Sequence, residues 1–104
     1  PGSEVHAVFA ILKQKDADAV IAAMSGEIAH WYLAPLSNAS AYAVRDVEKI
    51  IKKYNALSHL DVSVSIHSDI PAAWDTACRL ARPKTDMVLG FGSFFTVSEI
   101  LIFK

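Results

Sequence analysis

His6-Ala7-Val8-Phe9-Ala10-Ile11-Leu12 is the stretch of sequence that decides the fold. After His6 it is continuously apolar, which is typical of a strand that is covered on both faces of a parallel sheet. Asp16 follows a short polar break and is a good N-cap for a helix that continues to about Met24, where Gly26 ends it. The sequence therefore predicts a β-strand followed by an α-helix.

The same order of strand and helix continues to the end of the chain. Further strands are predicted over residues 28–33, 62–66 and 87–91, the second of them nearer a sheet edge because its apolar residues alternate. Further helices are predicted over residues 40–54, with a solvated face of charged residues between Arg45 and Lys53, and over residues 72–81, preceded by the N-terminal signals Asp69 and Pro71. The capping box at 96–99 predicts a last helix from there onward. Alternation of this kind predicts an α/β fold, a Rossmann-like three-layer domain with a mainly parallel sheet and right-handed crossovers.

Composition limits the classes of function. The 104 residues are 53% hydrophobic and 20% charged, with a formal net charge of −1, as in one compact globular domain. Because basic and acidic residues balance, we expect neither a nucleic-acid-binding nor a membrane-binding surface. The apolar runs are too short to cross a bilayer, and we expect a cytoplasmic location.

Most familiar catalytic and metal-binding patterns are absent from the sequence. His6, His30, His59 and His67 are scattered without HxxxH or HxH spacing, so no metal site is predicted. Glycine-rich dinucleotide and phosphate-binding loops and the GxSxG elbow are also missing. Cys78, the single cysteine, is expected to lie buried and inert on the inner side of its helix, together with Trp74 and Ala77.

Ligands of open parallel sheets bind beyond the carboxyl ends of the strands, where four loops lie, over residues 13–16, 34–40, 67–69 and 90–96. The first and the last of them carry the candidate binding residues. Gly92 permits a tight turn or the close approach of a ligand, and Ser93 with free helix N–H groups could hold a carboxylate or phosphate. The alternative to ligand binding is that Gly92 only turns the chain and that Ser93 or Thr96 only caps a helix. Lys15 could meet an anion at the end of the first strand, or be a solvated side chain beside an ordinary cap.

Residues 92–99, Gly-Ser-Phe-Phe-Thr-Val-Ser-Glu, resemble the G-S-F-[FH]-T-V stretch near the C-terminus of folylpolyglutamate synthases and bifunctional dihydrofolate synthases. Four further segments resemble the family in the same order along the chain: Lys15-Asp16 (K-D), residues 31–36 (W-Y-x-A-P-L), residues 39–41 (the end of R-G-A-[ST]-A) and residues 73–77 (A-x-x-x-A). The chain departs from the pattern at Asn38-Ala39, where the family has Arg-Gly. It also lacks the D-x-A-H-N-P motif and the P-loop ATPase domain.

The resemblance implies that residues 1–104 are the C-terminal, glutamate-ligase-type domain of a Mur-ligase-like enzyme, truncated on its N-terminal side. The whole enzyme would be a bacterial ATP-dependent ligase. With ATP and Mg²⁺ it would activate a folate or dihydropteroate carboxylate as an acyl phosphate, which the amine of L-glutamate then attacks. Ser93 and Gly92 would contribute to substrate binding, with Lys15 near the cleft.

The isolated piece is expected to contain no catalytic residue, metal or bound cofactor, and to be inactive alone. Loss of the strand and helix that carry D-x-A-H-N-P would leave a sheet edge or face uncovered, so we expect self-association there. The alternative is a Rossmann-like binding or interaction module without ligase activity.

Overall fold

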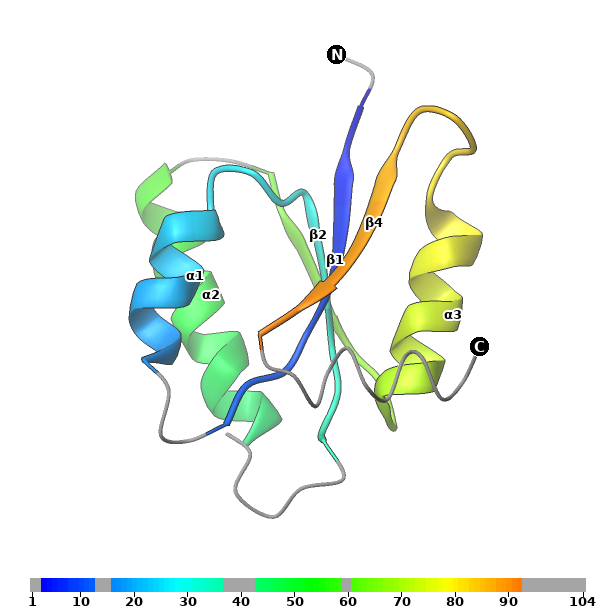
Figure 1. Ribbon diagram of the computed structural model, residues 1–104. Coiled ribbons are helices and arrows are strands. Elements are labelled where there is room, and N and C mark those ends of the chain that lie inside the picture. Colours follow the sequence, from blue (N-terminus) through cyan, green and yellow to red (C-terminus); the bar gives the residue numbers. More distant parts are fainter. Residues whose placement is uncertain (1–2, 13–15, 37–42, 59–60, 93–104) are drawn as a thin grey trace.

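The computed structural model describes residues 3–12, 16–36, 43–58 and 61–92, which form four strands and three helices in alternation (Figure 1). In chain order these elements are β1 (Val5–Phe9), α1 (Ala17–Met24), β2 (His30–Leu33), α2 (Val44–Ser58), β3 (Ser63–Ile66), α3 (Ile70–Leu80) and β4 (Met87–Phe91). Each strand and helix predicted within these ranges is present, but α2 continues to Ser58, four residues beyond its predicted end. The helix predicted from residue 96 onward lies outside the described residues.

The four strands form one parallel sheet in the order β3-β2-β1-β4. β3 is an edge strand, as its alternating sequence predicted. The chain moves outward from β1 through β2 to β3 and then crosses back to place β4 on the other side of β1. The strand order therefore reverses between β1 and β4, and we call the carboxyl ends of these two strands the switch point.

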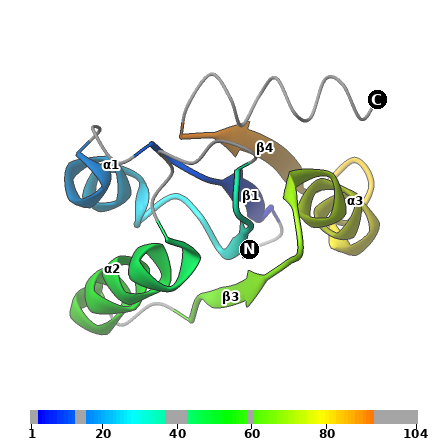
Figure 2. The same ribbon diagram turned by 90° about the horizontal axis from the view of Figure 1, so that it is seen from below.

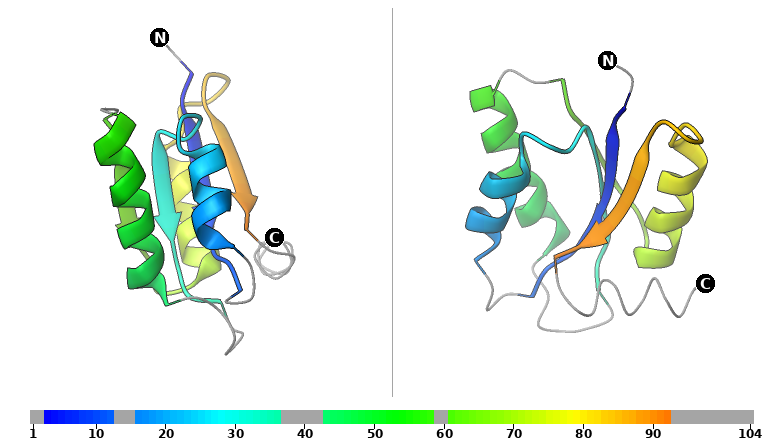
Figure 3. Two further views of the ribbon diagram at one scale, coloured as in Figure 1. Left: turned by 90° about the vertical axis from the view of Figure 1, so that its left-hand side faces the viewer. Right: turned by 45° about the horizontal axis from the view of Figure 1, so that its top comes forward.

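Helices cover both faces of the sheet, which confirms the three-layer architecture (Figure 2). α1 and α2 pack side by side on one face, and α3 lies on the other (Figure 3). On the first face Phe9 and Trp31 pack against Ile21 of α1 and Ile51 of α2. All four side chains are almost fully buried, and burial of one such side chain stabilises the fold by about 1.5–3 kcal/mol.

The caps predicted for two helices are present. The Asp16 carboxylate accepts a hydrogen bond of 3.0 Å from Ala19 N at the start of α1. The Asp69 carboxylate accepts one of 2.9 Å from Ala72 N at the start of α3. α1 ends at Met24 as expected, but Ser25 stays right-handed and Gly26 has no positive φ. The helix therefore ends in an ordinary turn and not through a left-handed glycine.

The prediction for Cys78 was wrong, because its side chain is exposed. The buried positions of α3 are Ile70, Ala73 and Ala77, which lie on one stripe of the helix. Cys78 is one residue further on, a rotation of about 100° around the helix axis, and so faces away from the sheet. Trp74 is partly buried and packs against the same core cluster.

Candidate functional site

The switch point lies where the two predicted binding loops meet the sheet. Phe9 at the end of β1 is paired with Phe91 at the end of β4, so the segments that follow leave the sheet side by side. Gly92 is the first residue after β4, and Asp16 begins α1 after β1. Lys15 and Ser93 themselves lie outside the described residues. The parallel register thus confirms that both loops begin at the same edge, where ligands of such sheets bind.

Gly92 lies in a turn where a side chain would not fit. Its φ is 114°, and a Cβ atom there would lie 2.3 Å from the carbonyl oxygen of Ala10 and 2.9 Å from the ring of Phe9. Such distances are far shorter than van der Waals contact, so the turn after β4 can pack on the end of β1 only without a side chain. This supports the structural alternative for the glycine, and its part in ligand binding stays a prediction.

A second group of polar side chains lies at the opposite, amino-terminal end of the strands, on the face covered by α3. His6 of β1 and His30 of β2 are register partners, and their rings stack with centroids 4.4 Å apart. The two histidines and their hydrogen-bonding partners, which we call the histidine cluster, are Glu4, His6, His30, Tyr32, Ser63 and Asp86.

Hydrogen bonds fix the orientation of both imidazole rings. His6 has Nδ1 2.7 Å from the Tyr32 hydroxyl and Nε2 3.0 Å from the Asp86 carboxylate. His30 has Nδ1 2.6 Å from the Ser63 hydroxyl and Nε2 3.0 Å from the Glu4 carboxylate. Because an ionised carboxylate only accepts, each Nε2 carries a proton and donates it. In the neutral ring each Nδ1 then accepts from its hydroxyl.

Asp86 is the most strongly held carboxylate of the cluster. The Arg82 side chain donates to it at 2.8 Å, and the backbone N–H groups of Arg82 and Glu4 donate at 3.0 and 3.1 Å. Chiefly through the Arg82 guanidinium, these bonds hold the pKa of Asp86 far below its ordinary value. The pKa of Glu4 is also lowered, first by its hydrogen bond to His30. Both groups are therefore negatively charged at neutral pH.

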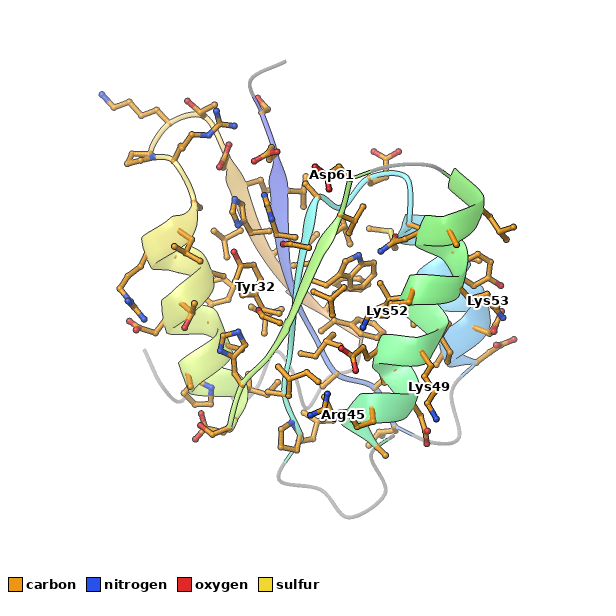
Figure 4. The ribbon with its side chains drawn as sticks, turned by 180° about the vertical axis from the view of Figure 1, so that it is seen from behind. Tyr32, Arg45, Lys49, Lys52, Lys53 and Asp61 are labelled. Atoms are coloured by element: carbon orange, nitrogen blue, oxygen red, sulfur yellow. The ribbon has the colours of Figure 1, made fainter. Side chains whose placement is uncertain are left out.

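The cluster lines a cavity of about 440 Å³. The cavity is bounded by Glu4, His6, His30, Tyr32, Ser63, Ser65, Leu80, Arg82 and Asp86. Figure 4 shows Tyr32 between α3 and β3. Leu80, which lines the cavity, is also the last residue of α3.

The sequence interpretation missed this group, because His6 and His30 are scattered in the sequence but adjacent in the sheet. The two are distant in sequence and form no local motif, so spacing could not reveal them. The usable signal was their equivalent position at the start of neighbouring parallel strands. One ligand atom from each of Glu4, His6 and His30 lies within 4.8 Å of the others.

The basic residues of α2 form a solvated face, as the charge pattern predicted (Figure 4). Arg45 and Lys52 are both 3.3 Å from the Glu48 carboxylate, and Lys53 is 2.7 Å from that of Asp18. Exposed pairs of this kind contribute little to stability. Neutralising partners on each side weigh against an anionic macromolecule as the ligand of this helix. No helix in the described ranges is long and apolar enough to cross a membrane.

Comparisons with known proteins identify relatives over nearly the whole chain, although no family model matches it. The chain is 33% identical over 101 residues to the dihydrofolate synthase/folylpolyglutamate synthase of Buchnera aphidicola subsp. Schizaphis graminum. The match covers 97% of this chain and 22% of that protein. The corresponding protein of the Acyrthosiphon pisum subspecies is 34% identical over the same lengths.

Solved structures agree with this relationship. FolC of E. coli, in complex with DHPP and ADP, superposes with a TM-score of 0.81 and 25% identity, over 95% of this chain and 21% of that one. The bifunctional enzyme of Yersinia pestis, complexed with AMPPNP and a Mn ion, gives a TM-score of 0.77 and 28% identity, over 96% and 22%. Nearly the entire length of this chain is thus homologous to dihydrofolate synthase/folylpolyglutamate synthases. The chain spans about one fifth of the length of the proteins it matches.

Proposed function

We propose that the chain is the C-terminal domain of a dihydrofolate synthase/folylpolyglutamate synthase. In this proposal its switch point forms the glutamate side of the ligase site. The homology over 97% of the chain supports the assignment to this enzyme. The reversal of strand order between β1 and β4 is the observation that carries the location, because it brings the ends of the Lys15 and Gly92-Ser93 segments to one edge.

In the complete enzyme, ATP with Mg²⁺ supplies the phosphoryl group that activates the folate or dihydropteroate carboxylate for attack by the amine of L-glutamate. The relatives bind nucleotides of this kind, ADP in E. coli and AMPPNP with a Mn ion in Yersinia pestis. The residues of this chain act by binding and orientation. The Ser93 hydroxyl holds a carboxylate of glutamate, and Lys15 offers a positive charge to an anionic group nearby. None of them transfers a proton.

A chimera tests the proposal. The segment of E. coli FolC that matches this chain is replaced by residues 1–104, and ATP-dependent addition of glutamate to dihydropteroate and to folates is measured. We expect ligation by the chimera and at least a roughly tenfold lower kcat/KM in Ser93→Ala and Lys15→Ala, since a lost charge-assisted contact costs more than about 1.4 kcal/mol. Ser25→Ala, at the end of α1 and at the opposite end of the sheet from the switch point, is the matched control and should leave kcat/KM unchanged.

Two results would contradict the proposal. One is a chimera that folds, as judged by circular dichroism, and binds nucleotide but does not ligate glutamate. The other is an unchanged kcat/KM in both Ser93→Ala and Lys15→Ala. Ligation by the 104 residues alone would show instead that the chain is not merely one part of the catalytic unit.

A further inference from the structure

The histidine cluster contains the donor atoms of a transition-metal site. Glu4 offers a carboxylate oxygen and His6 and His30 each offer an imidazole nitrogen, all within 4.8 Å of one another. Two imidazoles with a carboxylate is a donor set that suits Zn²⁺ and its neighbours in the first transition row. The cluster lies at the amino ends of the strands, at the opposite end of the sheet from the switch point.

The hydrogen bonds around the two rings match what metal-binding histidines need. A ligating imidazole binds the metal through one nitrogen and donates the proton of the other to a fixed partner. The Nδ1 atoms of His6 and His30 already face the hydroxyls of Tyr32 and Ser63, at 2.7 and 2.6 Å. Transfer of the proton from Nε2 to Nδ1 would free Nε2 for a metal, and each hydroxyl would then accept where it now donates.

The required movement falls on the side chains that can move. Ligands around tetrahedral Zn²⁺ at about 2.0–2.1 Å are about 3.3 Å from one another, so the donors of this cluster must draw closer by up to roughly 1.5 Å. His6 is only 3% exposed and stays fixed in the sheet. The side chains of His30 and Glu4 are 28% and 45% exposed and have room to rotate toward it.

The local charge also favours a cation. Glu4 and Asp86 carry two negative charges, and Arg82 compensates one of them through its contacts with Asp86 and, at 3.8 Å, with Glu4. With both imidazoles neutral, the cluster keeps one net negative charge beside the donors. Asp86 Oδ2 lies 3.0 Å from His6 Nε2, so it is adjacent to any ion bound there. The 440 Å³ cavity gives a path of entry and space for water as a further ligand.

We propose that Glu4, His6 and His30 bind one divalent transition-metal ion, with Zn²⁺ the best match to the donors. The bound ion joins the segment before β1 to the first residues of β1 and β2. This inference is independent of the proposed ligase role, because the metal site neither includes nor contacts the residues of the switch point.

Calorimetric titration of the 104-residue chain with Zn²⁺ is the direct test. The protein is prepared without an affinity tag, and every variant also carries Cys78→Ser, because the exposed thiol would compete for the metal. We expect one ion per chain and an affinity at least roughly tenfold lower in Glu4→Gln and in His30→Gln, each of which removes one ligand. His67→Gln is the matched control. His67 contacts the Tyr32 ring on the same face but is not among the grouped donors, so this variant should bind as the parent does.

Nitrogen-15 NMR of the imidazole rings keeps the proposal testable if a variant fails to fold. Addition of Zn²⁺ to the parent should shift the Nε2 resonances of His6 and His30 and leave those of His67 in place. Failure to bind at about 100 µM Zn²⁺, a free energy near −5.5 kcal/mol, would overturn the proposal. So would unchanged affinity in both ligand variants, or an equal loss in His67→Gln.

Discussion

Replacement of Gly92 by alanine should destabilise the domain by at least about 2 kcal/mol. A residue with a side chain at a φ of 114° is strained by about 1–3 kcal/mol. The new methyl group would also lie 2.3 Å from the Ala10 carbonyl oxygen and 2.9 Å from the Phe9 ring. To relieve these two clashes, the backbone of two paired strands must move by roughly an ångström, and this movement adds to the energetic cost of the strained φ.

Urea unfolding followed by tryptophan fluorescence measures this loss, because Trp31 is fully buried and in contact with Phe9. A loss of 2 kcal/mol corresponds to a melting temperature lower by about 8–16 °C. Gly26→Ala is the matched control, since its Cβ would meet nothing within 4 Å and its φ is not positive. We expect this control to change the free energy of unfolding by no more than about 0.5 kcal/mol.

Equal stabilities of Gly92→Ala and Gly26→Ala would refute the reasoning about the turn after β4. The comparison also matters for the ligase site. Because Gly92 is required for packing, reduced activity in Gly92→Ala would not identify a ligand contact there. Only Ser93→Ala and Lys15→Ala separate binding from folding at the switch point.

Three further outcomes follow from the described contacts. Asp69→Ala removes the cap of α3 and should lower the free energy of unfolding in urea by about 1 kcal/mol. Asp75→Ala on the same helix loses only an exposed ion pair and should lower it by less than about 0.5 kcal/mol. Equal losses would contradict the capping role. Cys78 should react with a thiol reagent in the native state as fast as in urea, and protection in the native state would contradict its exposure. The pKa of Asp86 is lowered on folding, so its stabilising effect is present at neutral pH and is lost as the pH falls below about 4. The free energy of unfolding of Asp86→Asn should therefore depend less on pH between about 5 and 2 than that of the parent protein. Equal pH dependences by urea unfolding would argue against that role.

Local signals were sufficient for most of the fold. Residues 7–12 are apolar because β1 is an inner strand of the sheet and, with the residues that follow it, is buried under the helices, and this burial is what the sequence displays. Asp16 and Asp69 correctly indicated the starts of two helices, because capping depends on one side chain and its neighbours in sequence. The position of Cys78 was predicted wrongly because a short helix fixes its inward stripe only through tertiary contacts, and Ile70 and Ala73 set that stripe here.

The sites were less accessible to prediction than the fold. The Gly92 turn was found from the sequence because it directly follows a predicted strand, but the strand order that makes the switch point was not predicted. The histidine cluster depends on which strands become neighbours and in what register. His6 meets His30 only because β1 pairs with β2, and it meets Asp86 only because β4 returns to the other side of β1. No pattern within a single segment contains that information.

The return of β4 also determines the order in which the domain can be completed. The contact between Glu4 and Asp86 joins residues 82 apart in sequence, so it closes a long loop at a cost in chain entropy that nearby contacts do not have. β1, β2 and β3 can pair while the chain is still being synthesised, but β1 keeps an open edge until the residues of β4 have been made. The switch point is therefore assembled last, and until then the nascent chain exposes the edge of its central strand to other chains.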